Sequence, residues 1–248
     1  TMRRAYLVNG VGRAMELRED GRLVPLFAVG DDALDKPIHV EAHKEHLFLA
    51  FAGGQYQHSA IGNPLTWSGL LGAEAFSTGD EITTLKSIQG GVLIIGCRNR
   101  LIALRGNNSA DWQQDTVSDS VGITMGTLQS LFVPVGVSDR GLVRLDRVQE
   151  FGDFTLSMLD TTDKVSSVIG NYQWVNSSQL SSANQFRLYS TSGINLIAAL
   201  DATGTPRFST FRYPAAVIGA WRYDEAKERN FFALAGMGYV YELHEDAF

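Results

Sequence analysis

Six hairpin-like segments recur along this chain and restrict the folds that it can adopt. Each joins an apolar run, a turn containing glycine and a second strand-like run: AYLVNGVGRAMEL, HLFLAFAGGQYQHS, GVLIIGCRNRLIAL, SLFVPVGVSDRGLVRL, NQFRLYSTSGINLIAAL and NFFALAGMGYVYEL. They recur every 39 to 55 residues when measured at Tyr6, Leu47, Val92, Leu131, Phe186 and Phe231. The four-stranded blades of β-propellers repeat at roughly 40 to 50 residues. The spacing predicts an all-β fold, a β-propeller of about six four-stranded blades in a single domain over residues 1–248.

Another β-rich segment precedes five of the six hairpins and is predicted to be the inner strand of its blade: PIHVEA, EITTLKS, GITMGTL, VSSVIGN and AAVIGAW. Small and β-branched residues suit strands that crowd together near a propeller axis. The first hairpin has no leading strand, and the last is followed only by HEDAF. One blade is therefore expected to be incomplete, or to be completed by strands from both termini.

The remaining local signals concern turns. Each hairpin contains a glycine where a positive φ is expected, at Gly10, Gly53, Gly96, Gly136, Gly193 and Gly236. Helical periodicity is almost absent, and the polar stretch EAKERN, residues 225–230, is predicted to be a turn. The chain is thus expected to consist of strands and turns throughout.

The composition indicates a globular protein and disfavours two classes of partner. The chain has 248 residues, of which 44% are apolar, and a formal net charge of -6. This charge has the wrong sign for a surface that holds phosphates with Lys and Arg, so sequence-specific nucleic-acid binding is not expected. The longest apolar runs, such as residues 92–95, are strand-sized, so no membrane contact is expected. The single cysteine, Cys97, is predicted to be a buried and inert thiol.

No metal or cofactor site is predicted, although three kinds of stretch resemble known ones. The histidine cluster in HVEAHKEH comprises His39, His43 and His46, with Glu41 and Glu45 among them. On a strand and turn these side chains should diverge, which favours a solvated connection over a metal site. The acidic stretch DDALD, residues 31–35, lacks the EF-hand order of ligands and is expected to be a solvated loop. NGVGRAM and AGMGYVY contain G-x-G but lead into strand-like sequence, so hairpin turns are predicted rather than phosphate-binding loops.

No catalytic residue is predicted either. The chain has no G-x-S-x-G elbow, and no histidine stands in a recognisable triad context. Glycoside cleavage would need two carboxylates at one mouth of the propeller, and the acidic residues in predicted interstrand loops are Asp80, Glu81, Asp160, Asp163 and Asp201. A sialidase-like site would also gather arginines, for which the candidates are Arg98, Arg100, Arg140 and Arg187. Spacing pairs none of these residues, so the glycan-active alternative stays open without a site.

The stretch IGNPLTWSG, residues 61–69, tests that alternative. Aligning its Thr-Trp pair on the sialidase Asp box, S-x-D-x-G-x-T-W, puts Gly62 where Asp belongs and Pro64 where Gly belongs. The stretch is instead predicted to be a structural clasp in which the ring of Trp67 packs on the blade beneath. Comparable rings after other hairpins are Trp112 and Phe208. Further aromatic residues at strand positions are expected in the core, namely Phe48, Phe132, Phe186 and Phe231.

Several phrases, taken in order, carry a resemblance to a known family: DKPIHVEAHKEHLFLAF, HSAIGNPLTWSG, GDEITTLKSIQGGVLIIGCRNRLIALRG, EFGDFTLSMLD, NQFRLYSTSG and GYVYELHEDAF. From about residue 9 to residue 248, the chain resembles the propeller region of tail structural proteins from short-tailed bacteriophages, the nozzle or tail-tube hub class. The resemblance implies a virion protein that forms rings, commonly six-fold, around the DNA exit channel. It also implies that the chain is a fragment or excised domain of a longer one. It carries over no catalytic, cofactor or metal residues.

The leading hypothesis is therefore a non-enzymatic structural protein of a phage tail, made in the host cytoplasm and placed in the virion. Expected partners are other tail or portal proteins and further copies of the chain in a ring, although the isolated domain could be monomeric. Two polar stretches are predicted to be docking loops, residues 105–115 and 176–184, because binding usually lies on loops of a rigid scaffold. The alternatives are a glycan-binding or sialidase-like propeller and a cellular protein-interaction propeller.

Overall fold

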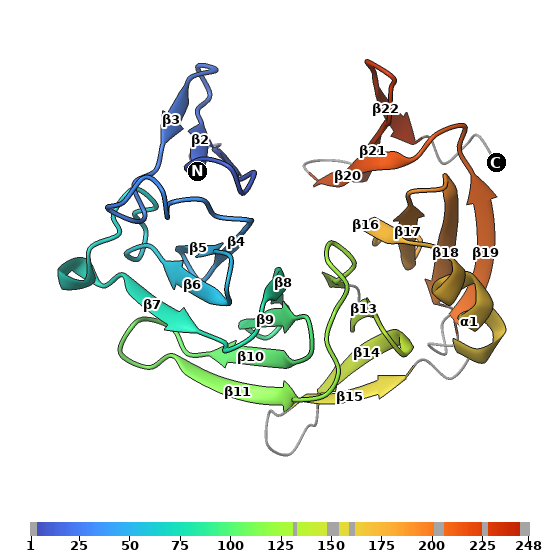
Figure 1. Cartoon of the computed structure of the whole chain (residues 1–248), viewed down its shortest axis with the longest axis horizontal. Coiled ribbons are helices and arrows are strands. Elements are labelled where there is room, and N and C mark those ends of the chain that lie inside the picture. Colours follow the sequence, from blue (N-terminus) through green and yellow to red (C-terminus); the bar gives the residue numbers. More distant parts are fainter. Residues whose placement is uncertain are drawn as a thin grey trace. The chain divides into compact units, whose positions relative to one another are not determined.

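The described strands form six small antiparallel sheets (Figure 1). The computed structural model describes residues 4–130, 133–147, 154–158, 162–200, 206–224 and 228–243. The chain divides into two compact units, Thr1–Gly122 and Ile123–Phe248, and each unit holds three sheets. The predicted all-β architecture is confirmed, with four sheets of four described strands, as expected of a blade, and two sheets of three.

The first unit contains the sheets β1-β2-β3, β4-β5-β6-β7 and β8-β9-β10-β11. Their strands are β1 (Ala5–Leu7), β2 (Met15–Leu17), β3 (Leu23–Pro25), β4 (His39–His43), β5 (His46–Ala50), β6 (Gln55–His58), β7 (Glu74–Ser77), β8 (Ile82–Ile88), β9 (Val92–Cys97), β10 (Leu101–Arg105) and β11 (Gln113–Ser118). A single 3-10 turn, η1 (Gly69–Leu71), lies between β6 and β7.

The second unit contains the sheets β12-β13-β14-β15, β16-β17-β18-β19 and β20-β21-β22. Their strands are β12 (Gln129–Ser130), β13 (Pro134–Ser138), β14 (Gly141–Arg147), β15 (Phe154–Met158), β16 (Trp174–Leu180), β17 (Gln185–Ser190), β18 (Ile194–Leu200), β19 (Pro206–Arg212), β20 (Val217–Asp224), β21 (Glu228–Leu234) and β22 (Val240–Leu243). One helix, α1 (Thr162–Asn171), lies between β15 and β16.

All six predicted hairpins form antiparallel pairs, namely β1 with β2, β5 with β6, β9 with β10, β13 with β14, β17 with β18 and β21 with β22. Three of the predicted leading strands are present as β4, β8 and β20. As expected, within residues 4–243 the first sheet shows no leading strand and the last shows none after its hairpin. Three described strands form each of these two sheets.

The other two predicted leading strands are wrong. VSSVIGN, residues 165–171, lies in α1, and its side chains at Val165 and Ile169 are buried against the fourth and fifth sheets. Val168 and Tyr172 pack on the same cluster, so the apolar positions follow the i, i+3, i+4, i+7 spacing of a helix. GITMGTL, residues 122–128, is irregular, and the leading strand there is the two-residue β12 that follows it.

The true leading strand of the fifth sheet is β16, which occupies most of a predicted docking loop, residues 176–184. That prediction is wrong because the polar side chains of this strand find partners inside the protein. The Ser178 hydroxyl and the Tyr189 hydroxyl lie 2.9 Å apart, and the Ser177 hydroxyl donates to Gly126 O at 2.7 Å. A polar strand can be buried at low cost when its groups are hydrogen-bonded.

Two further local predictions need correction. Gly96 and Gly136 lie inside β9 and β13 rather than in turns, whereas the other four hairpin glycines have the expected positive φ. In the stretch 225–230, residues 225–227 lie outside the described part, and Glu228–Asn230 begin β21 instead of forming a turn.

The core lies between neighbouring sheets, and β5 shows how it is built. Side chains alternate along a strand, so Phe48 and Ala50 face the third sheet while Leu47 and Leu49 face the first. All five residues of β5 are buried because both of its faces are covered. This explains the uninterrupted apolar runs in the hairpins. Cys97 belongs to the same core, and burial raises the pKa of its thiol to about 11, as expected for an inert cysteine.

Candidate functional site

The connection between β6 and β7, residues 59–73, has the most unusual surface chemistry in the described chain. Its sequence, SAIGNPLTWSGLLGA, contains no charged residue, although 19% of the chain is charged. Four large aliphatic side chains on it are exposed: Ile61 by 56%, Leu65 by 41%, Leu70 by 98% and Leu71 by 65%. We call residues 59–73 the neutral loop.

The neutral loop is held in one conformation by its own hydrogen bonds. The main-chain N–H of Asn63 donates to Ala60 O, that of Thr66 to Asn63 O, and that of Ala60 back to Thr66 O. A further bond from Gly62 N–H to Glu45 O ties the loop to the β4–β5 turn. The loop therefore presents its aliphatic side chains from a fixed backbone.

Trp67 anchors the neutral loop to the core, as the predicted clasp requires. Its ring is half-buried against the cluster formed by the first and second sheets, which includes Leu26 and Leu49. Its indole N–H donates to Pro64 O at 3.0 Å. The rings of Trp112 and Phe208 pack in the same way on the clusters between other sheets.

Replacing Trp67 with alanine should lower the free energy of unfolding by about 2 kcal/mol, roughly half the cost of truncating a fully buried tryptophan. Trp67→Phe keeps an aromatic ring, although a smaller one, and loses one hydrogen bond, so it should cost about 1 kcal/mol. Urea unfolding of both variants measures the difference. Equal stability of Trp67→Ala and the unaltered protein would contradict the clasp.

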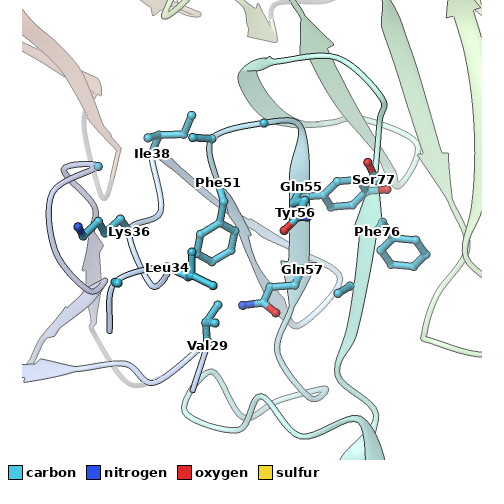
Figure 2. A pocket seen from close by; sticks show the side chains of 15 residues that line it. Val29, Leu34, Lys36, Ile38, Phe51, Gln55, Tyr56, Gln57, Phe76 and Ser77 are labelled. Carbon is cyan, nitrogen blue, oxygen red and sulfur yellow. The ribbon is translucent and has the colours of Figure 1, made fainter. Parts of the chain in front are cut away.

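A cavity of about 770 Å³ lies beside the second sheet, between the β3–β4 connection and strands β6 and β7 (Figure 2). Its apolar wall includes Val29, Leu34 and Phe51, and Lys36, Gln55 and Gln57 supply polar groups. No carboxylate is among the described residues that line this cavity. These residues therefore supply neither the acid nor the base that glycoside cleavage needs.

The histidine cluster is placed differently from the sequence expectation. His43 and His46 are 3% and 2% exposed, so the predicted solvated connection is wrong, while His39 is half-buried. His43 and His46 face each other across the β4–β5 hairpin, and both rings contact Trp112. His58, which the sequence did not single out, completes a group of three buried imidazoles. We call His43, His46, His58, Phe48 and Trp112 the ring cluster.

Hydrogen bonds fix the protonation of one imidazole of the ring cluster, that of His58. The His58 Nδ1–H donates to Ser59 O at 2.9 Å, and the Trp112 indole N–H donates to His58 Nε2 at 3.1 Å. His58 must therefore be neutral. Burial lowers the pKa of His58, and burial together with Lys44 and His46 lowers the pKa of His43 to about 4. In the described residues no group of three His, Cys, Asp or Glu side chains is arranged to hold a metal ion.

Asp80 and Glu81, two of the acidic candidates, make local hydrogen bonds and ion pairs. Asp80 accepts bonds from the main-chain N–H groups of Glu81 and Asn99, and Glu81 pairs with Arg98. The Arg100 guanidinium donates to Thr78 O at 2.8 Å, so these arginines tie the β9–β10 turn to the β7–β8 connection. Asp163 lies in α1 rather than in a loop, and Asp160 and Asp201 lie outside the described residues.

The arginines of the second unit also make local contacts. The side chain of Arg187 is buried and donates to Gln185 Oε1, while Arg140 lies at the β13–β14 turn. No described arginine–carboxylate arrangement in either unit resembles a sugar-cleaving site. No catalytic constellation is thus assembled from the sequence candidates within either described unit.

The remaining candidates are structural. Asp35 is fully buried and pairs with Arg13, so only part of DDALD is the solvated loop that was predicted. Both G-x-G stretches lie in hairpin turns, as expected. Phe48 and Phe186 belong to the core, Phe132 lies outside the described residues, and Phe231 is only half-buried because its neighbour Phe232 is the core residue. No helix in the described part is long and apolar enough to span a membrane.

Part of the stretch 105–115, predicted to be a docking loop, is a loop, and its docking role stays a prediction. The connection runs from Gly106 to Trp112, between β10 and β11. The Asp111 carboxylate accepts the N–H groups of Asn107 and Asn108, which lowers its pKa, and Lys44 donates to Gly106 O. This loop is therefore tied to the second sheet by polar contacts, whereas the neutral loop exposes apolar side chains.

Comparison with solved structures gives the fold. The chain is similar to BBS1N in its complex with ARL6DN, at a TM-score of 0.66 and 14% identity over 98% of this chain and 73% of that chain. It is similar to YCF48 from Cyanidioschyzon merolae, at a TM-score of 0.64 and 12% identity over 99% of this chain and 80% of that chain. It is also similar to virginiamycin B lyase from Staphylococcus aureus, at a TM-score of 0.59 and 8% identity over 93% of this chain and 73% of that chain. The chain has the six-bladed β-propeller fold.

These likenesses establish the propeller fold and nothing finer, because the identities are low and the fold hosts unrelated functions. The neighbours include a propeller held in a protein complex and a lyase. No protein-family model matches the chain, and no curated protein matches it in sequence. The function must therefore be argued from the surface of this propeller.

Proposed function

We propose that this chain is a non-enzymatic propeller that assembles with another protein subunit through the neutral loop, residues 59–73. The observation that carries the proposal is the set of four exposed aliphatic side chains on a loop without charge. Single exposed leucines are common on protein surfaces, but four exposed aliphatic side chains on one short uncharged loop favour an interface. The centres of protein interfaces are also depleted in charge, as this loop is.

The way the loop is held supports the same function. Binding costs less when the binding segment is already ordered, because less conformational entropy is lost. The hydrogen bonds at residues 60–66 and the packing of Trp67 supply that order before any partner arrives. Leu70 and Leu71 lie on η1, none of whose residues is buried.

The setting we propose is the tail of a short-tailed bacteriophage, with the chain as a virion structural protein. The support is the sequence resemblance, one phrase of which, HSAIGNPLTWSG, overlaps the neutral loop. In the described part of two other phrases, QFRLYS forms β17 and VYEL forms β22. In this setting the partners are other tail or portal proteins or further copies of the chain.

A cellular protein-interaction propeller is the second candidate, favoured by the likeness to BBS1N, which was crystallised in complex with ARL6DN. Both candidates predict protein binding without catalysis, and they differ in the partner. Recovery of the chain in purified phage particles would support the tail setting. Turnover of a glycoside that one carboxylate substitution abolishes would contradict both.

Placing aspartate at both Leu70 and Leu71 should reduce incorporation into the assembled particle or complex by at least about tenfold, because two charges would be buried at an apolar contact. The melting temperature should hardly change, since neither side chain contributes to the core. Quantitative mass spectrometry of purified assemblies measures incorporation.

Val11→Asp is a matched control, because Val11 is an exposed apolar residue of the same unit, 75% exposed, outside the neutral loop. It should assemble normally. Normal incorporation of the Leu70 and Leu71 double variant would remove the neutral loop from the interface.

A further inference from the structure

Trp112 packs on three buried imidazoles of the second sheet. Its ring centroid lies 5.9 Å from those of His43 and His58 and 5.7 Å from that of His46. Each of these histidines is at most 3% exposed, whereas Trp112 is half-buried. Trp112 is thus the member of the ring cluster that lies nearest to solvent.

The hydrogen bond between Trp112 and His58 exists only while His58 is neutral. The Trp112 indole N–H donates to His58 Nε2 at 3.1 Å, and the His58 Nδ1–H donates to Ser59 O at 2.9 Å. A proton added to His58 must go to Nε2, where the new N–H would face the indole N–H. The edge of an aromatic ring carries a positive partial charge, so the imidazolium would also repel the indole. Protonation of His58 therefore breaks the bond to Trp112.

The other two imidazoles favour the same movement. The Nε2 atoms of His43 and His46 are buried and have no hydrogen-bond partner among the described residues. A proton on either atom would create a buried, charged N–H without an acceptor, which is costly. The ring centroids of His46 and His58 lie 4.6 Å apart, so a charge on one disfavours a charge on the other. Each such charge is better solvated when Trp112 moves away.

Trp112 ends a surface connection, residues 106–112, that can move with it. The Asp111 carboxylate accepts two main-chain N–H groups of the same connection, which therefore keeps its own shape. The connection is tied to the second sheet at both ends, because Lys44 donates to its first carbonyl and Trp112 donates to His58. Loss of the bond at Trp112 frees one of these ends.

The same connection borders the neutral loop. A methyl group added at the Cα of Gly72 would lie 3.7 Å from the Ser109 hydroxyl oxygen, so the two loops are neighbours. Ser59, the first residue of the neutral loop, accepts hydrogen bonds from the rings of His46 and His58 at 2.7 and 2.9 Å. Movement at the ring cluster thus reaches the neutral loop from two sides.

We propose that Trp112 and the connection 106–112 form a proton-operated lid, closed over the ring cluster at neutral pH and open in mild acid. Opening solvates the protonated imidazole and leaves the indole N–H free to bond to water. The consequence for partner binding, that acid alters the surface beside the neutral loop, rests on the proposed function, whereas the lid itself does not.

The charges around the ring cluster leave His58 as the group that couples the lid to pH. Besides the histidines, the charged and titratable side chains on the strands and turns that carry or contact the cluster are Glu41, Lys44, Glu45, Tyr56, Glu74, Lys86, Cys97, Arg105, Asp111 and Asp115. Lys44 adjoins His43 and disfavours its protonation. Main-chain N–H groups lower the pKa of Asp111, which stays ionised in mild acid, and burial keeps Cys97 neutral by raising its pKa to about 11.

Hydrogen exchange of the Trp112 indole N–H measures the lid in the whole isolated chain. Its rate, divided by that of free tryptophan at the same pH, gives the equilibrium for opening. Burial lowers the pKa of His58 in the closed state, and the ordinary histidine pKa is about 6.5. Opening should therefore be about tenfold more favourable at pH 5.5 than at pH 7.5. The main-chain amides of β9 should keep their protection over this range, because the core stays folded.

Two variants test the link between the lid and His58. His58→Gln keeps an acceptor for the indole N–H and has no proton to gain, so opening should change by less than about twofold between the two pH values. Trp112→Phe keeps a ring but has no donor, so the pKa of His58, followed by the resonance of its Cε1–H, should rise. His46→Gln is the matched control and should keep the tenfold rise.

A rise that persists in His58→Gln, or that the β9 amides share, would overturn the lid. An unchanged pKa of His58 in Trp112→Phe would do the same. The double aspartate variant at Leu70 and Leu71 should show normal opening, so failure of this inference and failure of the proposed function are distinguishable.

Discussion

Replacing Phe48 with alanine is expected to lower the free energy of unfolding by about 3 to 5 kcal/mol, the usual cost of truncating a fully buried phenylalanine. Phe48 has no exposed surface and belongs to the core between the second and third sheets. Its ring centroid lies 5.3 Å from that of His58 and 5.7 Å from that of Trp112. The surrounding strands are held by their ladders and cannot collapse into the cavity.

Phe231→Ala is the matched control, because Phe231 occupies the corresponding hairpin strand of the sixth sheet but is only half-buried. The Arg229 guanidinium lies over its ring, 5.0 Å from the ring centroid. It should cost about 1 kcal/mol. Urea unfolding of both variants gives the comparison, and a cost at Phe48 no larger than that at Phe231 would contradict the described core.

The second large effect is a loss of stability in mild acid. The pKa of His43 is lowered to about 4 in the folded protein, mainly by burial, and the pKa values of His58 and His39 are also lowered by burial. The unfolded chain therefore takes up protons first as the pH falls below the ordinary histidine pKa of about 6.5. The contribution of these histidines to the free energy of unfolding should be fully present above about pH 6.5. It should decline as the pH falls toward about 4, by at most about 1.4 kcal/mol per pH unit for each histidine.

Charged groups near the ring cluster also affect the pH dependence of stability. Lys44 adjoins His43 and disfavours its protonation, while Lys86 lies near Glu41 on the neighbouring strand. Burial raises the pKa of Glu41, so the contribution of this carboxyl group has the opposite pH dependence: it stabilises the fold at low pH, and this stabilisation is lost as the pH rises. Glu74 lies opposite His58 in the β6–β7 ladder, and Asp111 lies beside Asn107, to which Lys44 donates.

His43→Gln isolates the histidine contribution, because glutamine can keep the bond to the Ser87 hydroxyl and has no proton to gain. Free energies of unfolding measured in urea from pH 7.5 to 5 should fall less steeply for this variant than for the unaltered protein. An equally steep fall in the two proteins would show that the pKa of His43 does not differ between the folded and unfolded states.

Much of the fold could be predicted because the hairpins combine two independent signals. Their apolar runs are long enough for strands covered on both faces, as in β5, and their glycines mark most of the turns at a regular spacing. The alternation of Phe48 and Leu49 between two neighbouring cores could not be predicted, since both are simply apolar in the sequence.

The errors lie where local composition and tertiary context disagree. VSSVIGN is rich in β-branched residues, yet its apolar positions follow a helical spacing that only the described packing of Val165 and Ile169 decides. NSSQL was taken for a loop because serine and asparagine favour turns, but Ser177 and Ser178 are buried with partners from other strands.

The predictions about the candidate sites were right or wrong depending on how much they needed the strand pairing. The histidines were expected to be solvated because a polar, charged stretch surrounds them, and the side-chain alternation that buries His43 and His46 depended on an unknown pairing. The clasp at Trp67 was predictable, since a lone aromatic after a proline corner has few other roles. The exposure of Leu70 and Leu71 was missed because leucines are ordinarily assigned to the core.

Site-specific photo-crosslinking tests the central claim most directly. A photoreactive amino acid at position 70, in the neutral loop, should form a crosslink to one defined protein partner in the native assembly, which mass spectrometry then identifies. The same group at Asp119, an exposed position outside the loop, should give no crosslink to that partner. Equal crosslinking at both positions, or none at position 70 in an intact assembly, would contradict binding through the neutral loop.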